Sequence, residues 1–165
     1  MFFLPCMMVA ILLILAYIYI CCDFTLAEAG YYCARSFISG EFSASLCWQI
    51  YFYLLIRGNI EGKWFLECAL LLVVYAAIYG VIFALEKYLQ GEGDSIRITS
   101  RELITVIIIT AAVYTVSNLS YIDQDALFGS RFAGEMFTIR TLVDLSGMAV
   151  LYAYHIMVRE LQMKF

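Results

Sequence analysis

Five apolar stretches, each close to the length that crosses a lipid bilayer, constrain this chain more than any other feature of its sequence. They cover residues 4–22, 26–56, 65–85, 103–120 and 135–158. A helix of about 20 apolar residues spans the hydrocarbon core. Because 64% of the residues are apolar and only 15% are charged, the composition excludes a water-soluble domain. We therefore expect an all-α integral membrane protein, a bundle of about five transmembrane helices forming one membrane domain over residues 1–165.

The last apolar stretch differs from the others because its helical pattern continues into charged residues. The span 135–158 is followed directly by the sequence RELQMK, and neither Gly nor Pro occurs after Gly147. Gly and Pro are the residues that most often end a helix. We predict that this helix leaves the membrane without a break, that residues 159–165 begin a cytoplasmic linker helix, and that the helix transmits motion across the membrane.

Four ionisable residues lie inside the predicted spans. Arg35 and Glu41 fall in the second span, and Arg140 and Asp144 lie four residues apart on one face of the last span. Charged groups inside a bilayer are costly, so they usually pair with one another or line a functional cavity. We predict that these four residues form a polar intramembrane cluster, with Arg35 and Glu41 as partners of the pair on the last helix. Two interpretations stay open: a static ion pair between helices, or a cluster that senses a ligand by shifting between two arrangements.

The distribution of Lys and Arg predicts the orientation, since cytoplasmic loops carry more of these residues than external ones. With five spans, five basic residues share one side and three share the other, namely Lys87, Arg97, Arg101, Arg159 and Lys164 against Arg57, Lys63 and Arg131. The excess predicts a multi-pass protein whose C-terminus is cytoplasmic.

No motif in the sequence predicts an active site. The chain has no Gly-rich nucleotide-binding motif, no GxSxG and no HExxH. His155 is the only histidine and has no neighbours at metal-ligand spacing, so we interpret it as a packing residue near the cytoplasmic edge. The six cysteines show no CxxC spacing and are interpreted as small packing residues. We expect no catalytic residue, metal or cofactor here, and the absence of a basic run argues against a nucleic-acid partner.

Two long stretches resemble a family of bacterial proteins. They are CARSFISGEFSASLCWQIYFY, from Cys33 to Tyr53, and SNLSYIDQDALFGSRFAGEMFTIRTLVDLSGMAVLYAYHI, from Ser117 to Ile156. Both are similar to the membrane sensor region of Firmicutes sensor histidine kinases whose catalytic end is a GHKL-type ATPase domain. These kinases are broadly similar to receptors for quorum-sensing peptides. One departure is Cys47, at a position where the family pattern leads us to expect an acidic residue.

The resemblance implies that the last span continues into a dimerisation helix with a phosphoacceptor histidine, followed by an ATP-binding domain. Motifs for these parts do not occur in the 165 residues. We therefore expect the input region of a two-component sensor kinase without its kinase core, located in the bacterial cell membrane and not itself an enzyme. An extracellular peptide or small molecule is the expected signal, and a second copy of the chain is an expected partner besides the lipid bilayer. The alternative is an autonomous small multi-pass membrane protein, either a transporter subunit or an interaction partner.

Overall fold

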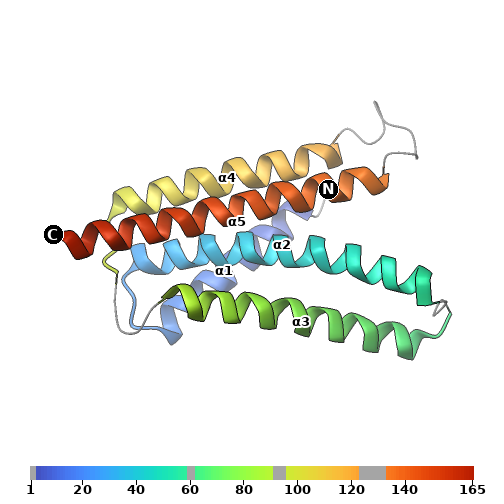
Figure 1. Cartoon of the computed structure of the whole chain (residues 1–165). Coiled ribbons are helices and arrows are strands. Elements are labelled where there is room, and N and C mark those ends of the chain that lie inside the picture. Colours follow the sequence, from blue (N-terminus) through green and yellow to red (C-terminus); the bar gives the residue numbers. More distant parts are fainter. Residues whose placement is uncertain (1–2, 59–61, 91–95, 123–132) are drawn as a thin grey trace.

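The computed structural model describes residues 3–58, 62–90, 96–122 and 133–165, and its regular structure within these ranges is entirely helical. The helices are α1 (Phe3–Cys21), α2 (Leu26–Gly58), α3 (Trp64–Gln90), α4 (Ser100–Ile122) and α5 (Ala133–Lys164). Each predicted span corresponds to one helix, and consecutive helices run in opposite directions along the bundle (Figure 1). The predicted cluster residues lie in α2 and α5, whereas Arg131, used to predict the orientation, lies outside the described residues.

Three helices are long and apolar enough to cross a membrane. These candidate spans are Trp64–Leu89 in α3, Ser100–Asn118 in α4 and Ile139–Lys164 in α5. The apolar part of α1, Pro5–Cys21, is shorter, and α2 carries Arg35 and Glu41 among its apolar residues. The chain is therefore an all-helical protein with three candidate transmembrane helices among its described residues.

Much of the outer surface of the bundle is apolar. On α3, for example, the side chains of Leu72, Val81 and Phe83 are exposed on the outside of the bundle. Contiguous exposed apolar surface of this kind is rare on a soluble monomer and is typical of a membrane contact. Four of the six cysteines also face outward, and only Cys33 and Cys47 are buried packing residues.

Capping side chains determine where α2 and α4 begin. The N–H of Thr25 donates to Oε2 of Glu28 at 2.8 Å, and the N–H of Glu28 donates to the Thr25 hydroxyl at 3.3 Å. At α4, the N–H of Thr99 donates to Oε2 of Glu102 at 2.8 Å. Both starts follow the pattern Thr-x-x-Glu, in which the two side chains satisfy backbone donors that a helix start leaves without partners.

Helix α2 holds the centre of the bundle. It packs against each of the other four helices, and α4 also packs against α5 (Figure 1). The buried face of α2 includes the small residues Ala29, Ser43, Ser45 and Cys47. Small residues let helices approach closely inside a membrane, where a hydrophobic driving force between helices is absent. Although the sequence singles out the last helix, the helix that contacts all the others is the second one.

Two apolar clusters fill the space around α2. The larger joins α2, α4, α5 and the connection before α4, and its buried members are Tyr31, Ile38, Phe42, Ile96, Ile98, Val106, Met148, Leu151, Tyr152 and Val158. The smaller lies between α2 and α3 and consists of Cys47, Val74 and Ile78. Cys47 is fully buried there. A thiol suits this apolar setting, whereas the acidic side chain expected from the family pattern would have no ion-pair partner in this cluster.

Candidate functional site

Two polar networks join α2 and α5, and the second also reaches α3 through the half-buried Glu86. The Arg140 network comprises Glu41, Ser45, Arg140 and Asp144. The His155 network comprises Tyr31, Arg35, Glu86, Tyr152 and His155. Burying polar and charged groups is costly unless they pair, so buried polar networks mark places of structural specificity or function. We therefore treat the two networks as the candidate functional site.

The Arg140 network joins α2 and α5 through one guanidinium and two carboxylates. Nη2 of Arg140 donates to Oε2 of Glu41 at 2.7 Å, and Nε lies 3.9 Å from Oδ2 of Asp144. The hydroxyl of Ser45 donates to the same Asp144 oxygen at 3.1 Å. The i,i+4 pair expected within the last helix is thus present, and the shorter contact of its arginine goes to the neighbouring helix.

Burial makes this network sensitive to the loss of any one member. The side chains of Arg140 and Glu41 are 15% and 18% exposed, and that of Asp144 is 1% exposed. Removing one partner of a buried pair leaves a charge in a low-dielectric setting, which costs about 3–5 kcal/mol. The network therefore holds α5 in one rotation and one height against α2.

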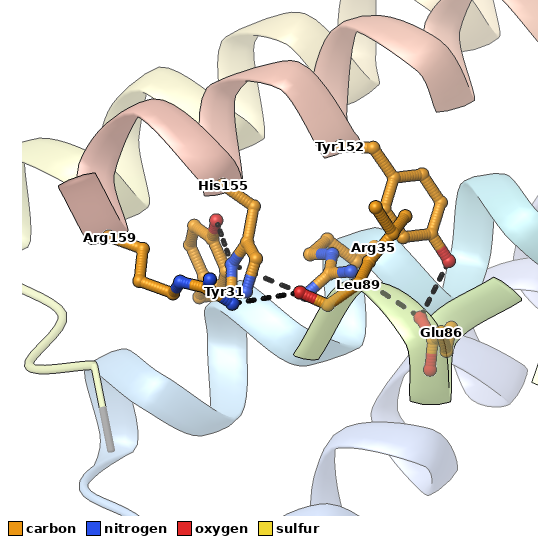
Figure 2. A network of polar contacts seen from close by, with 7 residues as sticks. All are labelled: Tyr31, Arg35, Glu86, Leu89, Tyr152, His155 and Arg159. Carbon is orange, nitrogen blue, oxygen red and sulfur yellow. Dashed lines mark hydrogen bonds and ion pairs between the residues drawn. The ribbon is translucent and has the colours of Figure 1, made fainter. Parts of the chain in front are cut away.

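The His155 network is built around a buried imidazole (Figure 2). Tyr31 Oη lies 3.0 Å and Arg35 Nη1 lies 3.4 Å from Nδ1 of His155. A guanidinium can only donate, so Nδ1 is the acceptor in this contact and the ring proton resides on Nε2. The imidazole, 3% exposed, thus links α5 to two residues of α2 that lie one turn apart.

Arg35 extends the network to a third helix. Its Nη2 lies 3.4 Å from Oε1 of Glu86 on α3, and the Tyr152 hydroxyl on α5 donates to the same oxygen at 2.7 Å (Figure 2). The guanidinium also stacks over the Tyr152 ring, 4.8 Å from its centroid. One turn beyond His155 on α5, Arg159 Nη1 donates to the carbonyl of Leu89 at 2.9 Å. That carbonyl belongs to the last turn of α3, where carbonyls lack partners within the helix.

The two networks form polar layers at different heights along both helices. Tyr31 and Glu41 are ten residues apart on α2, and their partners His155 and Arg140 are fifteen residues apart on α5. At 1.5 Å per residue, these separations are about 15 Å and about 22 Å. Ile38, Met148 and Leu151 belong to the apolar cluster that packs these helices together. A sliding of α5 by one turn would therefore break both layers at once.

The structure corrects the predicted four-residue cluster. Glu41, Arg140 and Asp144 come together, but Arg35 lies in the other network and does not contact the pair on α5. The reason is helical geometry. Residues six apart differ by about 240° around the axis and about 9 Å along it, so one contact cannot use both Arg35 and Glu41.

The sequence pattern does not predict two central residues of the His155 network. The predicted third span ends at Leu85, but α3 continues to Gln90 and keeps Glu86 within the helix. His155 was interpreted as a packing residue, whereas it accepts hydrogen bonds from a buried tyrosine and an arginine. A usable signal exists, because Tyr152, His155 and Arg159 follow the i, i+3, i+7 pattern of one helical face.

Within residues 3–58, 62–90, 96–122 and 133–165, no group of three His, Cys, Asp or Glu side chains is arranged to hold a metal ion. Comparisons of the chain with protein-family models, with curated proteins and with solved structures give no match. The functional argument therefore starts from the geometry of the two networks.

Proposed function

We propose that this chain is the membrane-embedded input region of a signalling protein of the sensor histidine kinase type, and that it transmits a signal through α5. The observation that carries the proposal is the continuity of α5. One unbroken helix, Ala133–Lys164, holds a member of each polar network and ends in charged residues. A rigid helix anchored at two buried layers moves as one body, so a change at either layer reaches its C-terminal end.

In this proposal the chain crosses the bacterial cell membrane five times and its C-terminus is cytoplasmic. Helix α2 has 33 residues, which is about 50 Å, against a hydrocarbon core of about 30 Å. Glu41 lies near the middle of α2, so the Arg140 network lies near the centre of the bilayer. The His155 network then lies toward the cytoplasmic boundary, where α5 leaves the membrane.

The proposed mechanism is a shift between two arrangements of α5 against α2. A ligand shifts such an equilibrium only if it binds one arrangement more tightly than the other. We propose that a peptide or small molecule acts from the external side or within the bundle, that breaking and remaking the Arg140 network accompanies the shift, and that the protein works as a dimer.

Cysteine accessibility tests the topology. The six native cysteines are replaced by alanine, and single cysteines are placed at the exposed positions Lys63 and Lys164, which lie in connections or helix ends at opposite ends of the bundle. A membrane-impermeant maleimide should label K63C only from outside and K164C only from inside. Labelling of both positions from the same side contradicts the crossing of α3, α4 and α5 on which the five-span topology depends.

A spin-label distance measurement tests the movement of α5. Labels at Leu26 of α2 and Leu161 of α5 occupy exposed positions outside both networks. Substitution R140Q, or the milder S45A where R140Q does not fold, removes a contact between these helices. We expect the distance distribution to shift toward a second population displaced by about one helical turn, roughly 5 Å. An unchanged distribution in a folded variant contradicts transmission through α5.

The autonomous small membrane protein is the second candidate, and the burial of Asp144 favours it. A carboxylate at 1% exposure within a membrane helix is typical of proton and ion pathways. Liposomes that contain the purified chain and a pH-sensitive dye separate the candidates. Proton flux that disappears in D144N supports a transporter, whereas the absence of flux together with the spin-label shift supports the input region.

A further inference from the structure

A pocket of about 570 Å³ lies at the end of the bundle where α5 finishes, apart from both polar networks. It forms where the connection before α4 meets the last turns of α5. Its polar lining residues are Arg97, Thr99, Arg159 and Gln162. None of these residues was part of the predicted cluster.

Hydrogen bonds hold the two sides of this pocket together. The N–H of Arg97 donates to Oε1 of Gln162 at 3.1 Å, and Nε2 of Gln162 donates to the Arg97 carbonyl at 2.6 Å. The side chains of Ile96 and Ile98 on either side of Arg97 are buried in the larger apolar cluster. The backbone at Arg97 is therefore fixed in place, and the pocket is preformed.

The pocket contains two positive charges that no described carboxylate neutralises. Neither Arg97 nor Arg159 forms an ion pair with a described residue. Nη1 of Arg159 donates to the Leu89 carbonyl, but its Nε is buried and has no hydrogen-bond partner among the described residues. The N–H of Thr99 is already used by Glu102. Both arginines line the pocket, and guanidinium donors match the oxygens of a phosphate group.

The position of the pocket indicates where its ligand would come from. The candidate spans Trp64–Leu89 and Ser100–Asn118 reach this end of the bundle, so the pocket lies where these helices would meet the membrane surface. Its lining also includes the apolar side chains of Ile96 and Met163. We propose that the pocket binds a phosphate-bearing anion, either the headgroup of an anionic phospholipid in the adjacent leaflet or a free phosphate.

The experiment measures phosphate-dependent stabilisation of the full chain in nanodiscs. One arm compares nanodiscs of phosphatidylcholine alone with nanodiscs of equal parts phosphatidylcholine and phosphatidylglycerol. The other arm adds inorganic phosphate to the phosphatidylcholine nanodiscs. Native mass spectrometry counts retained phosphatidylglycerol, and thermal unfolding reports stabilisation. Salt at about 0.5 M limits the Debye length to roughly 4 Å, so that general surface attraction is screened.

The test variant is R97Q. The side chain of Arg97 is exposed, and only the backbone of Arg97 forms the hydrogen bonds with Gln162, so the substitution leaves those bonds in place. R159Q is a second test variant, although it also removes the contact with Leu89. The matched control is R101Q, which removes the same charge from an exposed position on α4 that does not line the pocket. We expect R97Q to weaken binding about tenfold, the effect of losing one strong charge-assisted hydrogen bond, and R101Q to bind as the unmodified chain does.

The two arms identify the source of the anion. Retained phosphatidylglycerol that is lost in R97Q and kept in R101Q identifies a lipid headgroup site. Stabilisation by inorganic phosphate in phosphatidylcholine nanodiscs, with the same dependence on Arg97, identifies a free-anion site. Equal weakening in R97Q and R101Q, or no binding in either arm, overturns the proposal.

Discussion

At the scale of single residues, one arginine determines how two helices meet. Arg140 contacts a carboxylate on its own helix and another on α2, at 3.9 Å and 2.7 Å. A buried ion pair adds little net stability over an apolar pair of the same shape, but its breakage is costly because the remaining partner stays desolvated. The value of the network is therefore specificity, since only one placement of α5 satisfies Glu41 and Asp144 together.

We predict strong energetic coupling between Arg140 and Glu41. Either E41Q or R140Q should lower the free energy of unfolding by about 3 kcal/mol, because each leaves part of the network without its partner. The double variant should lose at least about 1 kcal/mol less than the sum of the two single losses. Unfolding of all four proteins in mixed micelles measures the coupling, and purely additive losses would contradict it.

The contacts of Arg35 depend on the planar shape of its guanidinium more than on its charge. Its planar guanidinium contacts His155 and Glu86 and stacks over the Tyr152 ring. An ammonium group keeps the charge but cannot make this set of contacts. We expect R35K to lose about 1–3 kcal/mol of stability, close to the loss in R35Q. Thermal unfolding in nanodiscs compares the two variants, and a fully stable R35K would show that the charge alone suffices.

At the scale of helices, α5 is fixed on two sides. The two polar layers set its height against α2, and a close approach sets its distance from α4. A Cβ atom added to Gly147 would lie 2.5 Å from Cγ1 of Val113 on α4. Side chains essentially never approach so closely, so glycine is required at this crossing for the helices to remain in contact.

We predict that G147A destabilises the bundle and that V113A partly rescues it. Overpacking costs about 1–3 kcal/mol, which exceeds the gain of about 1 kcal/mol from replacing glycine by alanine in a helix. Removing the two Val113 methyl groups makes room for the new Cβ. The matched control is G80A on α3, where an added Cβ meets no atom within 4 Å. A midpoint temperature of thermal unfolding for G147A that equals or exceeds that of the unmodified chain would contradict the close approach.

Across the whole bundle, α2 is the central helix and α3 is peripheral. Helix α3 packs extensively against α2 alone, and it reaches α5 only near its C-terminal end through Glu86 and Leu89. Elements with few packed neighbours open at a lower free energy than the centre of the same protein. The bundle is therefore expected to loosen from α3 while α2, α4 and α5 stay together.

Hydrogen exchange in detergent micelles checks this order. Amides in the middle of α2, around Ile38 and Phe42, should exchange most slowly. Amides in the first turns of α3, from Trp64 to Cys68, should exchange faster than those of its middle, because helix ends open at a lower free energy than helix centres. Y152F should speed exchange around Glu86 and leave the first turns of α3 unchanged. Equal protection of the α2 and α3 amides from exchange would contradict the central position of α2.

Much of this fold is predictable from the sequence because membrane spans depend on local properties. Length and apolar content alone place one span on each of the five helices, and the start of the second span, 26–56, matches that of Leu26–Gly58. The i,i+4 pair of Arg140 and Asp144 is equally local. The helix ends were harder to predict, because α3 runs past Leu85 through the charged residues Glu86 and Lys87.

Composition and local pattern are enough to predict that the chain is helical and which charged residues lie within the helices. These properties follow from composition and from contacts within one helix. Packing between helices, in contrast, sets the pairing of Arg35 with His155 and Glu86, the pairing of Glu41 with Arg140, and the central position of α2. Each of these pairings joins residues far apart in the chain, and their geometry depends on helix rotation and height, which packing alone sets.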